Sequence, residues 1–180
     1  MEKDDLKLES YSRRTVWIHW LSTLLIFGLI GTGIKMEGLE VSAHKFGLYQ
    51  VHFTLGMLVL LLTLIRVFAL IRDKRPNSLY TKGSTMWYAL EGVHYGLYGV
   101  LLWMCFSGVI SLSLEGILPS LLGSQWTELP EIMADGLHPI MLSHHIVAKL
   151  LFLLLIAHVG GVILYYLRFR KNTLPRIWFR

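Results

Sequence analysis

The residues of this chain with the clearest chemistry are histidines inside apolar stretches. His144 and His158 stand 14 residues apart near the C-terminal end. At about 100° per residue, 14 steps along an α-helix return a side chain to within roughly 40° of its first direction, about 21 Å further along the axis. Imidazole is an axial ligand of haem iron, so one helix face can carry two such ligands at two depths. Two further apolar stretches contribute one histidine each, His19 and His52.

Depth along the helices predicts how these histidines pair. A bis-histidine haem needs imidazoles on opposite faces of its ring at similar height. If the stretches cross a membrane in alternating directions, His52 and His144 lie near the outer face, and His19 and His158 near the inner face. The two pairs predict two haems and therefore an electron path across the membrane. His145 is the rival of His144, but its 13-residue spacing to His158 points it roughly 140° away from that ligand's face.

The composition indicates which elements must position the histidines. Of the 180 residues, 54% are hydrophobic and 16% are charged, and the mean hydropathy is +0.53. This profile is typical of integral membrane proteins. Four stretches are long and apolar enough to cross about 30 Å of hydrocarbon as helices: approximately residues 16–34, 46–71, 86–112 and 146–167. We therefore expect an all-α fold, an integral membrane four-helix bundle that forms one domain over residues 1–180.

Basic residues set the expected orientation, because Lys and Arg near short loops stay on the cytoplasmic side. They gather in the N-terminal segment, the second connection and the C-terminal tail, so these regions share one side. The third connection has no Lys or Arg and carries four acidic residues: Glu115, Glu128, Glu131 and Asp135. Both termini are therefore expected in the cytoplasm. The net charge of +5 suits anionic lipid headgroups at the helix ends, so we expect membrane lipid and no nucleic acid as partner.

The single cysteine limits other redox centres. Cys105 lies within the third apolar stretch, which excludes an internal disulfide, a covalent Cys-x-x-Cys-His haem site and a cysteine-ligated iron–sulfur cluster. Zinc is disfavoured, because its ligands converge within a few ångström, whereas these histidines form two groups about 20 Å apart. For any single membrane histidine, the alternatives to haem ligation are an interhelical hydrogen bond and a role in a proton relay.

Arginines and a glycine near the histidines are candidates for holding the rest of the haem. The two propionates call for donors, and guanidinium groups match carboxylates well. Arg66 reaches the depth of His19, and Arg13 and Arg14 precede His19 on the first helix. Gly56 leaves room for a flat macrocycle, or else serves helix packing.

Other polar residues have alternative assignments. His94 hydrogen-bonds a propionate or a quinone, or else pairs with Glu91. Lys149 lies within the fourth apolar stretch, one turn from His145, where a charge is costly enough to indicate a function. It pairs with a propionate, attracts an anionic substrate, or snorkels outward. The remaining basic residues at helix ends are interpreted as topology anchors: Arg72, Arg75, Arg168, Arg170, Lys171, Arg176 and Arg180.

Several short motifs carry a family resemblance. They are Tyr11-Ser12-Arg13, Ile18-His19-Trp20-Leu21, His52 with Gly56 and Arg66, His94 with Tyr98 and Gly108, and His144/His158 followed by Lys171-Asn172-Thr173-Leu174. In these motifs the chain resembles the bacterial cytochrome b561 family. The resemblance implies a multi-pass inner-membrane cytochrome with two haem b groups, linked to ubiquinone or another quinone, and ligated at His19, His52, His144 and His158. One branch of that family looks like a superoxide oxidase, which passes electrons from superoxide to ubiquinone.

The chain departs from the family pattern at two positions. Family members often have a proline where this chain has Cys105, which changes only a helix kink. The position of Lys149 is commonly uncharged in the family, so this lysine can alter the potential of the outer haem or its substrate.

Three functions are compatible with the sequence. The favoured one is an oxidoreductase of the superoxide:quinone type, or otherwise an electron carrier, that passes electrons from superoxide or a soluble donor through both haems to a quinone. The second is a b-type cytochrome anchor subunit of a hydrogenase or dehydrogenase complex, which needs a protein partner. The third is a haem-free helical scaffold or small transporter.

Overall fold

The computed structural model describes residues 9–73, 75–123 and 138–179. In these ranges the fold is all-helical and contains no strand, which confirms the predicted fold class. Four of the helices are long and apolar enough to cross a membrane. They are α1 (Arg13–Glu37), α2 (Ala43–Arg72), α3 (Thr85–Leu114) and α5 (Pro139–Phe169).

Each long helix extends beyond the apolar stretch that predicts it, because polar residues cap the ends. The side chains of Ser12, Ser42 and Ser84 accept hydrogen bonds from backbone N–H groups in the first turns of α1, α2 and α3. Such bonds satisfy donors that the helix itself leaves free. The largest difference is at α5, which begins at Pro139 rather than at residue 146. Proline suits this first position, since its missing N–H has no partner there in any helix.

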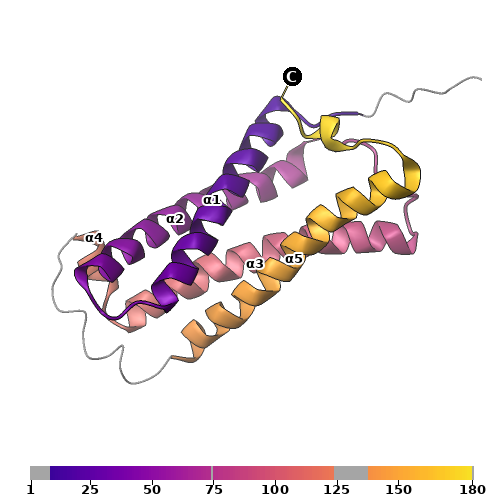
Figure 1. Cartoon of the computed structure of the whole chain (residues 1–180). Helices are drawn as coiled ribbons and strands as arrows, with labels where there is room; N and C mark the ends of the chain where they lie inside the picture. The colour runs from indigo at the N-terminus through magenta and orange to yellow at the C-terminus, as the bar shows by residue number, and fades with distance from the viewer. Residues whose placement is uncertain (1–8, 74, 124–137, 180) are drawn as a thin grey trace, which may run out of the picture.

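The long helices are arranged as two pairs. Helix α1 packs against α2, α3 packs against α5, and contacts between α2 and α3 join the pairs. In the described residues, no Cα atom of α5 comes within 8 Å of a Cα atom of α1 or α2. The ribbon in Figure 1 accordingly shows α5 running beside α3, away from α1 and α2. The described backbone of α5 therefore packs against that of α3 and not against that of α1 or α2.

A short helix, α4 (Leu118–Leu122), closes one end of the bundle. It follows a turn at Gly116, where a φ of +69° favours glycine. Two residues of this segment, Ile117 and Leu121, form a buried apolar cluster with Phe46 of α2 and Leu112 of α3. The cluster fixes the positions of α2 and α3 at this end, which we call the α4 end.

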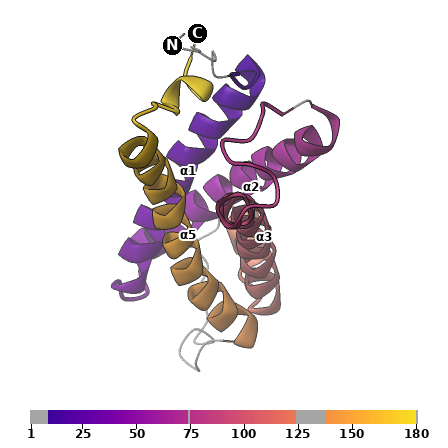
Figure 2. The same ribbon diagram turned by 90° about the vertical axis from the view of Figure 1, so that its right-hand side faces the viewer.

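The start of α1 meets the C-terminal segment at the opposite end of the bundle, which we call the termini end (Figures 1 and 2). The backbone N–H of Tyr11 donates to the carbonyl oxygen of Arg176 at 2.9 Å. The indole N–H of Trp20 donates to the carbonyl oxygen of Ile177 at 2.8 Å. These bonds hold residues 172–178, which we call the tail, against the start of α1. Glu128, Glu131 and Asp135 of the acidic connection lie outside the described residues.

Candidate functional site

At the α4 end, His52 of α2 faces His144 of α5, and their ring centroids are 6.5 Å apart. The Nδ1 atom of His52 lies 2.9 Å from the hydroxyl oxygen of Thr32 on α1. That hydroxyl donates its own hydrogen to the carbonyl oxygen of Gly28 at 2.9 Å. Because a hydroxyl has one hydrogen, it accepts the hydrogen on Nδ1 of His52.

The opposite ring is held in the same way. Nδ1 of His144 lies 3.0 Å from the hydroxyl oxygen of Ser107 on α3, and this hydroxyl donates to the carbonyl oxygen of Met104 at 3.2 Å. The imidazole packs directly against Gly108, because a Cβ atom there would be in van der Waals contact with Cε1 of His144 at 3.4 Å. Both imidazoles therefore carry their hydrogen on Nδ1, which leaves each Nε2 with a free lone pair. A metal-ligating histidine commonly has this arrangement.

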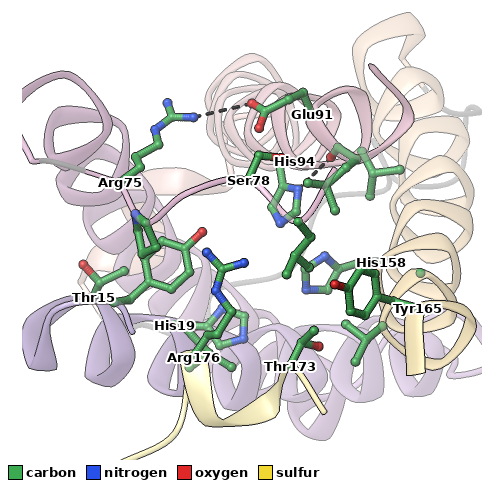
Figure 3. Close-up of a pocket in the computed structure, with 18 of the residues that line it drawn as sticks. Thr15, His19, Arg75, Ser78, Glu91, His94, His158, Tyr165, Thr173 and Arg176 are labelled. Atoms are coloured by element: carbon green, nitrogen blue, oxygen red, sulfur yellow. Dashed lines mark hydrogen bonds and ion pairs between the residues drawn. The ribbon is translucent and has the colours of Figure 1, made fainter. Parts of the chain in front are cut away.

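At the termini end, His19 of α1 faces His158 of α5 with ring centroids 6.2 Å apart (Figure 3). The guanidinium group of Arg66 on α2 lies 3.3 Å from Nδ1 of His19. It also lies over the ring of Tyr98, 5.5 Å from its centroid. Guanidinium is only a donor, so in this contact Nδ1 of His19 accepts and Nε2 carries the hydrogen. Ligation of a metal through Nε2 thus requires Arg66 to leave this contact.

The separation of the rings in both pairs fits a metal ion between them. A metal–imidazole bond of about 2.0 Å and a distance of about 1.1 Å from nitrogen to ring centroid place two coaxial imidazoles about 6.2 Å apart. The observed 6.2 Å and 6.5 Å are close to this value. The described residues contain no group of three or more His, Cys, Asp or Glu side chains able to hold a metal ion. Each pair offers two imidazole donors, which is the number that a bis-histidine haem uses.

A large pocket opens beside the pair at the termini end, with a volume of about 1590 Å³. Its wall includes both histidines of the pair together with His94, Arg66 and Arg14. A typical small-molecule site measures about 300–1,000 Å³, so this pocket has room for a macrocycle and a second molecule.

His94 is a third imidazole in this pocket, but its position differs from that of the paired histidines. Its ring centroid lies 5.1 Å from that of His158, which is too short for an iron ion between the rings. Its Nδ1 donates to the carbonyl oxygen of Leu90 at 2.7 Å, which directs Nε2 away from its own helix backbone. The expected alternative partner, Glu91, instead forms an ion pair with Arg75 at 3.5 Å (Figure 3).

The other predicted site residues lie in different surroundings. Gly56 borders open space, because a Cβ atom there would meet nothing within 4 Å. The ring of His145 lies 6.5 Å from that of His144, and Lys149 is exposed on α5. Arg13 is exposed and does not line the pocket, so the structure does not bring it to the histidines. This position differs from the expectation because Arg13 is the first residue of α1, about 1.7 turns before His19.

Sequence reasoning missed Thr32, Ser107 and Arg176. The two hydroxyls are single Ser and Thr residues on other helices, and no local pattern connects them to the histidines they contact. Arg176, interpreted above as a topology anchor, is buried and lines the pocket. Its position two residues after the Lys171-Asn172-Thr173-Leu174 motif, rather than its charge, was the available signal.

The family model for prokaryotic cytochrome b561 matches residues 10–180. The chain belongs to this family. Two relatives of this cytochrome cover most of its length. "Cytochrome b561 homolog 2" of Escherichia coli is 26% identical over 132 residues, which are 71% of this chain and 68% of that protein. "Probable superoxide oxidase CybB" of Yersinia pestis is 24% identical over 177 residues, which are 94% of this chain and 96% of that protein.

Membership of this family implies b-type haem and a role as an oxidoreductase or electron carrier. The residues present fit such a group, because each histidine pair has the separation that a bis-imidazole iron requires. At the α4 end the two hydrogen bonds at Nδ1 also leave both Nε2 atoms free.

Proposed function

We propose that this cytochrome transfers electrons across the membrane through two haem b groups, one ligated by His52 and His144 and the other by His19 and His158. The observation that carries the proposal is the pair of imidazole separations, 6.5 Å and 6.2 Å, each of which matches two imidazoles on one iron. When bound, haem supplies the redox chemistry, and the chain supplies ligands, orientation and charge.

Each helix that carries these ligands has a defined task in the proposal. Helix α5 carries one ligand of each pair, about 21 Å apart along its axis. Helices α1 and α2 each carry one facing ligand, and their backbones stay clear of α5 in the described residues. The space between α5 and the α1/α2 pair is therefore where both macrocycles lie. Arg66 turns from His19 to a propionate when the second haem binds, since a carboxylate is a better partner for guanidinium than a neutral ring.

The proposed orientation places the termini end in the cytoplasm. Basic residues gather at this end in the described part of the chain, and such residues favour the cytoplasmic side: Arg13, Arg14, Arg72, Arg75, Lys82, Arg168, Arg170, Lys171 and Arg176. For a bacterial protein this is the inner membrane. Electrons then enter at the α4 end, on the outer side, and leave at the termini end.

We propose superoxide as the donor and a quinone as the acceptor. The name of the Yersinia pestis relative, which aligns with nearly the whole chain, supports superoxide. Lys149 and His145 follow His144 along α5 and offer positive charge or hydrogen bonds to an anion. The volume of the termini-end pocket and the free Nε2 of His94 in its wall support a quinone there.

A reduced-minus-oxidised visible spectrum with haem quantitation tests the core of the proposal. The purified protein should contain two haem b groups per chain. His144→Ala and His158→Ala should each lose one haem, and the double variant should lose both. A protein without haem, or one whose haem content is unchanged in both single variants, would contradict the proposal. Quinone reduction driven by superoxide, measured in the intact protein, then tests the donor and acceptor.

A further inference from the structure

The tail brings a buried arginine into the wall of the termini-end pocket. Arg176 is 7% exposed. Its Nε donates a hydrogen bond to the carbonyl oxygen of Glu9 at 3.1 Å. Its Nη2 donates a second one to the carbonyl oxygen of Asn77 at 2.6 Å. The guanidinium also lies over the ring of Tyr11, 5.9 Å from its centroid. One side chain therefore joins the N-terminal segment, the α2–α3 connection and the tail.

Arg176 has no acidic partner in the part of the chain that the structure describes. The ion pair found there joins Arg75 to Glu91. Both acceptors of Arg176 are neutral carbonyl oxygens, whereas guanidinium has five N–H groups. A buried positive charge without a counter-ion is costly. The surroundings of Arg176 therefore call for an anion.

The pocket offers room for such an anion beside Arg176, which lines it together with His19. Figure 3 shows Arg176 on the pocket wall with His19 and Thr173. The tail is fixed next to this ligand by Trp20, whose ring lies 5.5 Å from that of His19 and 5.6 Å from that of Trp178. The tail thus docks at the depth of the histidine pair.

We propose that Arg176 binds a propionate carboxylate of the termini-end haem and that this bond holds the tail over the pocket. The inference rests on the proposed haem site. A haem has two propionates, and the second guanidinium beside the pair is that of Arg66. Arg75 is already engaged by Glu91. The planar fork of guanidinium matches a carboxylate with two parallel hydrogen bonds.

Transfer of haem to excess apomyoglobin, followed for each haem separately, tests this role. In Arg176→Gln the termini-end haem should leave on the order of 10- to 100-fold faster, because a charge-assisted bond is lost. The α4-end haem should leave at its normal rate, which also shows that the variant is folded. The matched control is Lys171→Gln, an exposed residue of the segment before the tail, and it should behave as the unaltered protein.

A lipid phosphate is the other anion that guanidinium could hold here, and haem dimethyl ester separates the two sources. This haem lacks the propionate charges, so the unaltered chain and Arg176→Gln should lose it at the same rate. In vesicles of phosphatidylcholine alone, the difference between the two proteins with ordinary haem should persist. The assignment to propionate would be overturned if Arg176→Gln still lost the dimethyl ester faster than the unaltered chain. It would also be overturned if the two proteins differed in haem loss only in vesicles that contain phosphatidylglycerol.

Trypsin cleavage after Lys171 reports the position of the tail independently of activity. Cleavage should be faster when the unaltered chain carries the dimethyl ester than when it carries ordinary haem. Equal cleavage rates would overturn the link between haem and tail. If the unaltered protein contains no haem, the proposed function fails. If it contains two haems and Arg176→Gln retains both with unchanged kinetics, only the present inference fails.

Discussion

Replacing Ser107 by alanine removes the hydroxyl that accepts a hydrogen bond from His144, a proposed haem ligand, and changes little else. The Ser107 hydroxyl lies 3.0 Å from Nδ1 of His144, and the residue is 1% exposed. Bulk water does not reach this position, so the Nδ1–H group of His144 is left without a partner. Serine and alanine differ by this hydroxyl alone, so the variant changes hydrogen bonding far more than packing.

The size of the effect follows from the missing bond. A buried donor without an acceptor costs about 1–3 kcal/mol, and outer partners of metal-ligating histidines typically change affinity about 10- to 100-fold. We expect the α4-end haem to bind about 10- to 100-fold more weakly in Ser107→Ala. Its midpoint potential should rise, because an imidazole without an acceptor on Nδ1 is a less basic ligand and stabilises ferric iron less. The termini-end haem, about 21 Å away along α5, should be unaffected.

Redox titration in the visible range, combined with haem transfer to apomyoglobin, measures both effects. Ser22→Ala is the matched control, since Ser22 is 4% exposed and its hydroxyl donates to the carbonyl oxygen of Ile18 in its own helix. Thr32→Val should reproduce the result from the other face of the haem, because it removes the 2.9 Å contact to His52. The reasoning is refuted if Ser107→Ala and Ser22→Ala have the same haem affinity and the same potentials.

Three further variants test other contacts. His94→Ala should keep both haems, because the 5.1 Å between the rings of His94 and His158 is too short for an iron ion between them. The variant should, however, reduce quinone more slowly. Loss of a haem would show instead that His94 is an iron ligand. Gly108→Val should displace the imidazole of His144 and release the α4-end haem. The control is Gly92→Val, which should retain this haem, because a Cβ atom at Gly92 meets nothing within 4 Å. Equal haem content in the two variants would contradict the role given to Gly108. Burial raises the pKa of Glu115, so the folded chain loses stability as the pH rises above the usual value of about 4.3. At pH 7, Glu115→Gln should therefore unfold at a higher temperature than the unaltered chain. Below pH about 4.3 the two proteins should unfold at the same temperature. An equal difference in unfolding temperature at both pH values would be evidence against a titrating carboxyl.

The helices and the pairing of their histidines follow from regular geometry, which is why the sequence predicts them. A 14-residue spacing puts His144 and His158 on one helix face, and alternating spans set the depth of His19 and His52. The structure brings these side chains together in the expected pairs, while their ligation of haem stays a prediction. The helix ends were less predictable, because the capping residues are polar and fall outside the apolar stretches.

The contacts around the histidines could not be predicted, because they join residues distant in sequence. Thr32 lies on α1 and contacts a ring on α2, and Ser107 lies on α3 and contacts a ring on α5. Each is an ordinary polar residue within its own helix pattern. Arg176 carries the same charge as its basic neighbours, and only the folding of the tail onto Tyr11 and Trp20 separates it from a topology anchor.

The two proposed haem sites differ in charge, and this difference gives electron transfer a direction. The ligands at the α4 end are held by neutral hydroxyls, whereas Arg66 and Arg176 line the pocket at the termini end. A positive charge stabilises reduced haem. At an effective dielectric constant of about 20, one unit charge roughly 10 Å from the iron contributes about 1.7 kcal/mol, or about 70 mV for one electron. The termini-end haem should therefore have the higher potential, so electrons run from the α4 end inward. Arg66→Gln should reduce the difference between the two midpoint potentials. If the difference stays the same or increases, the charge of Arg66 is not its cause.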